Sequence, residues 1–214
     1  MNAVPLSFRL RLLSSTVLCL LVLAGCDIIP APQADATRYF ALASPALDDS
    51  ATQPIHGTLR LGLKAVDVAP YLKKGVIVMR RGENELVYNE YARWAEPLEA
   101  SIARAVRTRL QADAKVARVF AAPFPFDQER DFDVAIGVSR CEGVQLGIGT
   151  AVARFVATVE ITSGGTAGEV VARKTFAMPD AVWDGRDYAA LARALSDAVG
   201  ALSQEVAAAL PEKK

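Results

Sequence analysis

The sequence predicts an α/β domain, bordering on α+β, in which a mixed β-sheet packs with two main helices. Apolar residues recur every three or four positions over two stretches, Pro97–Ala112 and Asp187–Leu210, which is the period of a helix. Seven or so shorter segments instead alternate apolar and polar residues or form short apolar runs, as strands do. Because one helix divides the strands and the other follows them, the order differs from a run of βαβ units with phosphate-binding loops.

The expected strands follow one another with short connections. A strand at Arg38–Leu42 is followed by a polar connector, Pro45–Gly57, and then by an alternating strand at Thr58–Val68. Pro70–Gly75 predicts a turn or a single helical turn. The remaining strands are expected at Val76–Arg80 and Glu85–Tyr88, paired as a hairpin, around Val116–Phe120, and at Asp131–Val144, Ala151–Ile161 and Val170–Phe176.

Each helix carries an apolar stripe. The first begins at Pro97, which suits a first helical position because its missing N–H would be unpaired there. We expect its stripe to pack on the sheet; the stripe comprises Leu98, Ile102, Val106 and Leu110. The buried stripe of the last helix comprises Leu191, Leu195, Ala198, Val199, Leu202, Val206 and Leu210, and Pro211 ends it.

The first 25 residues have the features of a bacterial lipoprotein signal peptide. Two arginines precede an apolar run, Leu12–Ala24, which is shorter than the roughly 20 residues of a membrane span and typical of a signal peptide. The run ends in Leu23-Ala24-Gly25-Cys26, which resembles a lipobox. We predict that the chain is cut before Cys26 and that Cys26 is acylated, which anchors the protein to a membrane without spanning it. An ordinary signal peptide with an incidental cysteine is the alternative.

These features divide the chain into a signal peptide (1–25), a lipid-anchored tether (26–36) and a single domain (37–214). The tether carries Pro30 and Pro32 among small or polar residues. Its ten residues after the cysteine span at most about 35 Å when extended, enough to hold the domain clear of the lipid headgroups.

Composition excludes some function classes. The first 25 residues hold two arginines and no acid, so the mature chain has 22 basic residues against 24 acidic ones, which gives no support to nucleic-acid binding. Hydrophobic residues make up 52% of the chain and allow a packed core. With Cys26 acylated, Cys141 has no partner for an intramolecular disulfide in an oxidising periplasm. It lies in an apolar run, so we expect a buried, inert thiol.

The sequence offers little for catalysis, and we predict no enzyme activity, no metal and no cofactor. His56 is the only histidine, and a Ser-His-Asp triad or a zinc site would have to rely on it. Asp131 and Asp133 are two residues apart on an expected strand and so share a face. They form either a general-acid pair or, as we favour, part of a solvated strand face. Gly147-x-Gly149 is too short for a dinucleotide loop and precedes a strand. A basic cluster comprises Lys73, Lys74, Arg80 and Arg81; it is either a solvated hairpin or a contact to acidic lipid or a partner.

Four segments resemble a known family in the same order along the chain. They are Tyr39-x-Ala41-Leu42, Val68-Ala69-Pro70-Tyr71-Leu72, Ile77-Val78-x-Arg80 and, most specifically, Arg93-Trp94-Ala95-Glu96-Pro97-Leu98. They resemble the ABC-type transport auxiliary lipoproteins, the family of the paraquat-inducible protein C component of the Pqi system. The family often has Asp-Arg-Pro after the Tyr-Leu pair, where this chain has Lys73-Lys74-Gly75.

The resemblance implies a non-enzymatic periplasmic lipoprotein, possessing a fold similar to the amino-terminal domain of TolB. It further implies a partner, a mammalian-cell-entry (MCE) protein that carries lipid between the two membranes with an ABC ATPase. We also expect the domain to dock on that protein as a homo-oligomer. We take Trp94, Glu96 and Tyr71 as the candidate partner contacts, although Trp94 and Leu98 also fit a purely structural role in the core. The alternatives are a periplasmic lipid carrier with its own apolar cavity and a lipoprotein regulator of an envelope enzyme.

Asp27 and the family resemblance predict different membranes for the lipid anchor. Asp27 directly follows Cys26, which resembles the inner-membrane retention signal of enteric bacteria. The family implies the outer membrane, with the domain in the periplasm. We favour the outer membrane because sorting signals differ between bacterial groups.

Overall fold

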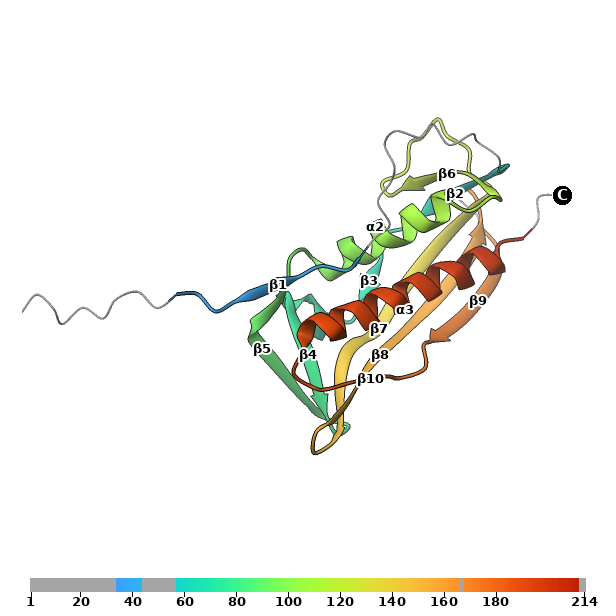
Figure 1. Ribbon diagram of the computed structural model, residues 1–214. Coiled ribbons are helices and arrows are strands. Elements are labelled where there is room, and N and C mark those ends of the chain that lie inside the picture. Colours follow the sequence, from blue (N-terminus) through green and yellow to red (C-terminus); the bar gives the residue numbers. More distant parts are fainter. Residues whose placement is uncertain (1–33, 44–56, 166–167, 212–214) are drawn as a thin grey trace, which may run out of the picture. The chain divides into compact units, whose positions relative to one another are not determined.

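The computed structural model describes residues 34–43, 57–165 and 168–211 (Figure 1). The chain divides into two compact units, residues 1–36 and 37–214, and all of the described residues except 34–36 belong to the second unit. Cys26, Asp27 and His56 lie outside the described residues, so the roles that the sequence predicts for them stay predictions.

The described residues form a single mixed sheet of ten strands. The strands are β1 (Arg38–Phe40), β2 (Leu59–Leu63), β3 (Asp67–Val68), β4 (Val76–Arg81), β5 (Glu85–Trp94), β6 (Val116–Ala121), β7 (Phe132–Gly147), β8 (Thr150–Ser163), β9 (Val170–Ala177) and β10 (Ala181–Trp183). A 3-10 helix, η2 (Pro70–Lys74), joins β3 to β4. The main path through the sheet is β1-β5-β4-β7-β2-β6, and β8 branches from β7 to pair with β9 and β10.

The long strand β7 organises this sheet. One of its edges pairs antiparallel with β8 along nearly its whole length. Its other edge accepts three strands in turn, all parallel: β2 at its start, β3 near Val138 and β4 near Gly143. The strands β2, β3 and β4 therefore follow one another along a single edge of β7.

Both helices, α2 (Leu98–Gln111) and α3 (Tyr188–Ala209), lie beside each other on the same face of the sheet (Figure 1). Every residue of the two predicted stripes is buried, with at most 4% of its surface exposed. At the start of α3, the Asp187 carboxylate accepts a hydrogen bond from the backbone N–H of Ala189 at 2.9 Å and so caps the helix. The predicted helices, and the fold class of one mixed sheet with two helices, are confirmed.

The strand predictions need three corrections. The predicted strand Thr58–Val68 is two strands, β2 and β3, because the chain leaves the edge of β7 between Leu63 and Asp67. The strand predicted to end at Tyr88 continues as β5 to Trp94, where it pairs with β1. The short strand β10 was not predicted, because three residues carry too little periodicity to be recognised.

Candidate functional site

The candidate site is an open groove at the corner where β1 and β5 meet η2 and the start of α2. In the β1–β5 pair, Tyr39 lies opposite Arg93 and Phe40 opposite Trp94. The groove has a volume of about 610 Å³. It is lined by Thr37 and Tyr39, by the end of η2 and its cap (Leu72–Gly75), and by the segment that runs from the end of β5 into the first turn of α2 (Arg93–Glu99). Gly75 ends η2 with φ of 71°, a left-handed conformation that favours glycine.

The structure brings two of the three predicted contact residues together in this groove. Trp94 forms part of its floor and is buried, with 6% of its surface exposed. Glu96 lies on the rim, where its carboxylate accepts a hydrogen bond from Ser101 Oγ at 2.7 Å and pairs with Arg104. Both residues therefore shape the groove, and their role as partner contacts stays a prediction.

Tyr71 is not part of the groove lining and belongs to a different group of side chains. Its hydroxyl lies 2.8 Å from Glu142 Oε2 and 3.0 Å from the carbonyl oxygen of Ser139. Burial, reinforced by the Glu142 carboxylate, raises the pKa of Tyr71 because both disfavour the phenolate. Tyr71 can thus act on the groove only through η2, the element that carries it.

Glu142 is the centre of this second group and is fully buried, with none of its surface exposed. Arg80 binds its carboxylate with two nitrogens, at 2.6 Å from Nε to Oε1 and 3.3 Å from Nη2 to Oε2. Arg140 adds a third contact at 3.3 Å. The bidentate pair with Glu142 raises the pKa of Arg80, so the cation is the stable form. Sequence reasoning missed this cluster; the only signal was a glutamate within an expected strand, between Cys141 and Gly143.

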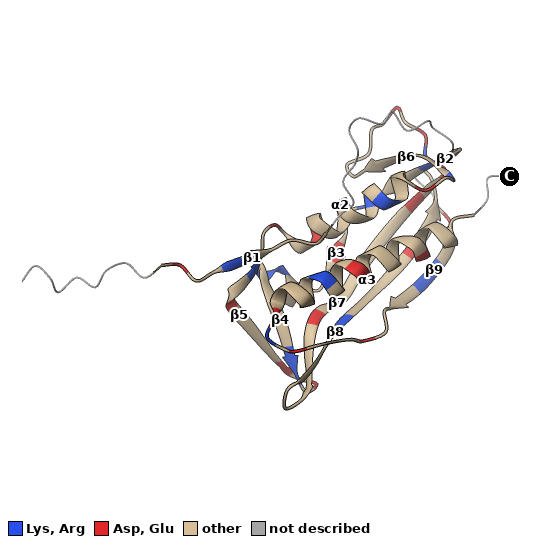
Figure 2. Cartoon of the chain, in the orientation of Figure 1, with Lys and Arg blue, Asp and Glu red and all other residues tan. Residues whose placement is uncertain are grey.

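The predicted basic cluster is divided among several local contacts. Lys73 pairs with Asp67 at 3.0 Å, Lys74 lies over the ring of Tyr88, and Arg81 is 3.7 Å from Glu85. Of the four residues of this basic cluster, Lys73 and Lys74 line the groove and the two arginines do not. In Figure 2, basic and acidic residues are interspersed over the described elements.

The prediction of a solvated face at Asp131 and Asp133 is wrong. Asp133 is buried and its carboxylate accepts two hydrogen bonds from Arg130, the shorter at 2.7 Å. Asp131 precedes β7 and accepts a hydrogen bond from the backbone N–H of Arg60 at 2.7 Å. Gly62 makes room for the pair, because a Cβ there would lie 2.2 Å from Asp133 Oδ1. The two carboxylates are therefore structural groups at the start of β7.

The described residues contain no group of three or more His, Cys, Asp or Glu side chains placed to hold a metal ion. Cys141 is buried as expected, and burial raises the pKa of its thiol. Within the same ranges, none of the helices has the length and apolar character that crossing a membrane requires.

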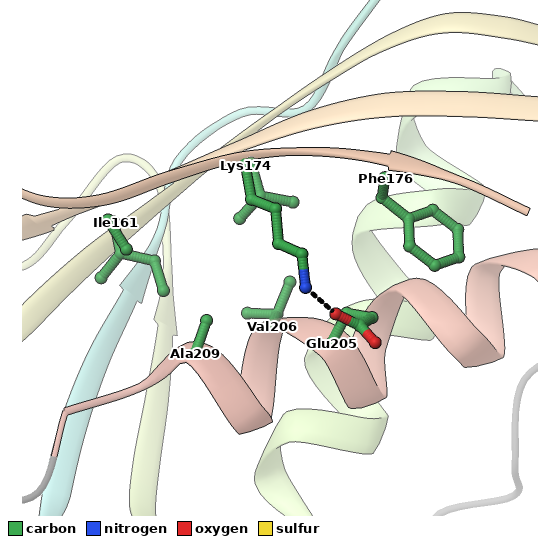
Figure 3. A pocket seen from close by; sticks show the side chains of 8 residues that line it. Ile161, Lys174, Phe176, Glu205, Val206 and Ala209 are labelled. Atoms are coloured by element: carbon green, nitrogen blue, oxygen red, sulfur yellow. Dashed lines mark hydrogen bonds and ion pairs between the residues drawn. The ribbon is translucent and has the colours of Figure 1, made fainter.

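A small apolar hollow lies between β9 and the end of α3 (Figure 3). Ile161, Phe176, Val206 and Ala209 line it, and the ion pair between Lys174 and Glu205 crosses beside them. Its volume is about 10 Å³, room for about one water molecule.

The described domain thus combines a sheet covered on one face by two helices with an open groove at one corner. The chain belongs to the family of ABC-type transport auxiliary lipoprotein components, which it matches over residues 40–207. It is accordingly a member of a family of lipid-anchored envelope proteins that assist ABC transport systems. A search of the curated proteins found no match.

Two solved structures share the fold, and a third is a weaker match. The protein XCC0632 from Xanthomonas campestris is 21% identical over 79% of this chain and 92% of its own, with a TM-score of 0.66. An uncharacterised protein is 15% identical over 80% of this chain and 97% of its own, with a TM-score of 0.58. The PelC dodecamer from Paraburkholderia phytofirmans is more distant, at 15% identity over 74% and 91% of the two chains and a TM-score of 0.46. At these identities the first two comparisons show the fold alone.

Proposed function

We propose that this protein is a non-enzymatic, lipid-anchored periplasmic component of an ABC-type lipid transport system, and that it docks on an MCE protein to help lipid pass between the envelope membranes. The observation that carries the proposal is the family match over residues 40–207, which begins within β1 and ends within α3. The match therefore covers the whole folded unit rather than one motif. A fold likeness to the amino-terminal domain of TolB, and a homo-oligomeric state, belong to the same proposal.

The anchor in this proposal is Cys26, at the start of a tether that ends at residue 36. The lipobox-like sequence before Cys26 supports this assignment. A cysteine with two or three acyl chains holds a protein on a membrane far more firmly than one chain does. We propose the outer membrane as its location, on the family resemblance rather than on Asp27.

The docking surface in this proposal is the α2 side of the groove. Ala95 and Pro97 are exposed there, and Glu96 is held in place by Arg104 and Ser101. Trp94 supports this wall from below, and Tyr71 fixes η2 on the other side. A partner residue that enters the groove would therefore meet a rim whose side chains are already ordered, which lowers the entropic cost of binding.

The lipid-carrier alternative is less well supported. A carrier needs an apolar cavity that holds an acyl chain, and each methylene group needs space comparable to a water molecule. The apolar hollow between β9 and α3 has room for about one water. The groove is much larger but has charged residues along its walls.

A direct binding measurement tests the proposal. The full-length acylated protein is purified in detergent and mixed with the MCE protein of the same bacterium, and the two are separated by size-exclusion chromatography. We expect a complex that Ala95→Arg weakens, because the new side chain fills the exposed rim of the groove. Thr158→Arg is the matched control, since Thr158 is exposed on β8 and lies outside the groove. Binding to a peptidoglycan synthase instead would favour the regulator.

A further inference from the structure

Three of the five tyrosines in the chain gather beside the groove, on the side away from α2. Tyr39 lines the groove, and Tyr88 and Tyr91 line a neighbouring hollow of about 510 Å³. The two hollows share Thr37, Lys74 and Arg93, so they form one continuous surface. We call Tyr39, Lys74, Tyr88, Tyr91 and Arg93 the tyrosine patch.

An irregularity in β5 creates this surface. Val76 of β4 pairs with Arg93, whereas Val78 pairs with Tyr88, so residues 89–92 lie opposite the single residue Ile77. The chain turns at this bulge, where the Asn89 side chain accepts a hydrogen bond from the backbone N–H of Tyr91 at 3.0 Å. As a result Tyr91 projects outward, with 62% of its surface exposed. Tyr39 on the neighbouring strand is 63% exposed.

The cations of the patch are available for an outside ligand. Lys74 Nζ lies 4.1 Å from the centre of the Tyr88 ring, and the described residues place no carboxylate within ion-pair distance of it or of Arg93. Among the described residues, Glu90 is the only acid that lines the hollow around Tyr91. Exposed aromatic rings combined with cations that no described carboxylate neutralises suit the polar layer of a membrane, because tyrosine has an apolar ring with a polar tip and basic side chains extend their charge toward phosphates.

We propose that the tyrosine patch rests on the headgroup layer of the membrane that holds the anchor, with Lys74 and Arg93 beside the phosphates of anionic phospholipids. This inference rests on the acylated Cys26 of the proposed function. Only ten residues, 27–36, separate that cysteine from Thr37, which lines both hollows. A chain of that length can hold the domain clear of the headgroups when it is fully extended, but its limit of about 35 Å keeps the patch within reach of the same membrane. The attachment raises the effective concentration of lipid and allows a weak surface contact to form.

Membrane contact leaves the α2 side of the groove for a protein partner. The hollow around Tyr88 and Tyr91 receives no residue from α2, whereas the groove wall from Ala95 to Glu99 lies outside it. The domain therefore has separate walls for lipid and for protein at the same corner.

Tryptophan quenching in vesicles tests this placement. The full-length acylated protein is reconstituted into phosphatidylcholine vesicles with and without phosphatidylglycerol, and some of the lipids carry brominated acyl chains that quench nearby tryptophan. Tyr91→Trp reports on the patch. Phe126→Trp is the matched control, because Phe126 is fully exposed in the connection between β6 and β7, and β6 lies at the other end of the sheet path from β1. The unsubstituted protein gives the signal of Trp94 and Trp183, which is subtracted.

We expect brominated lipid to quench Tyr91→Trp more than Phe126→Trp, and the difference to grow with phosphatidylglycerol. In the Tyr91→Trp background, Lys74→Gln and Arg93→Gln should each reduce the ratio of docked to undocked protein by about fivefold on anionic vesicles. Glu90→Gln should increase it, because it removes the acid that opposes binding.

The outcomes separate this inference from the proposed function. Equal quenching of the two tryptophans in an acylated protein overturns membrane contact of the patch and assigns the patch to a protein surface, while the proposed function stands. A protein whose mass shows no acyl chain on Cys26 overturns the anchor, and the inference fails with it.

Discussion

The two faces of the sheet are stabilised in different ways. The helix-covered face is apolar: Cys141 and Phe155, paired across β7 and β8, are buried beneath the helices. The next pair along these strands, Glu142 and Arg154, points to the other face because successive strand residues alternate. There the buried group is a carboxylate held by arginines. One face is thus held together by apolar packing, whereas the other depends on particular charges being matched.

The largest effect is expected on the helix-covered face. Ile102 is completely buried in the stripe of α2, so Ile102→Asp places a carboxylate in the core and should cost more than about 4 kcal/mol. For a domain of this size the melting temperature would fall by roughly 3 °C for each kcal/mol. Arg107→Asp is the control, since Arg107 is exposed on the same helix. A thermal melt of Ile102→Asp that matches the control would contradict the packing.

The other face should respond strongly to loss of its anion. Glu142→Gln removes the negative charge and one of the two oxygens that hold Arg80, so the guanidinium loses its buried, bidentate partner, and the change should cost about 3 kcal/mol. Glu85→Gln, which breaks the exposed contact with Arg81, should change the free energy of unfolding by less than about 0.5 kcal/mol. Urea unfolding of both variants measures the contrast, and equal effects would show that burial of the ion pair contributes nothing.

The free energy of unfolding should decrease in alkali. Burial raises the pKa of Cys141 above its ordinary value of 9.0, so above that pH the unfolded chain loses a proton that the folded chain keeps. This contribution is constant below about pH 9 and falls by about 1.4 kcal/mol per pH unit above it. Tyr71, whose pKa is also raised, adds a similar loss above pH 10. Cys141→Ala should flatten the profile between pH 9 and 10. If its urea-unfolding profile keeps the slope of the parent, the thiol is not the group responsible.

A smaller effect is expected at the start of α3. Asp187→Ala removes the side chain that accepts the Ala189 N–H and should cost about 1 kcal/mol. Asp187→Asn can still accept this hydrogen bond and should recover most of the loss. Chemical denaturation measures the free energy of unfolding of both variants. If Asp187→Ala leaves it unchanged, the cap contributes nothing to stability.

The contrast between the faces also explains how far the sequence could predict the structure. Apolar spacing identified both helices and the strands that cross the core, because residues such as Ile102 and Leu195 repeat with the period of their own element. It could not identify the Glu142 cluster, whose members come from η2, β4 and β7 and meet only through the sheet topology. The misassignment of Asp133 has the same origin, because Arg130 buries it from outside the strand. In the groove, the sequence located Trp94 and Glu96 through a family motif, but not the bulge at residues 89–92 that exposes Tyr91.

The most direct test of the central claim is to find the protein and its partner in the cell. A photo-reactive amino acid is placed at Ala95 in the full-length protein, the cells are irradiated, and the two membranes are separated on a density gradient. The account predicts a cross-linked MCE protein, recovered with the outer membrane and lost when the probe is moved to Thr158. Recovery in the inner membrane with no MCE protein attached would contradict it.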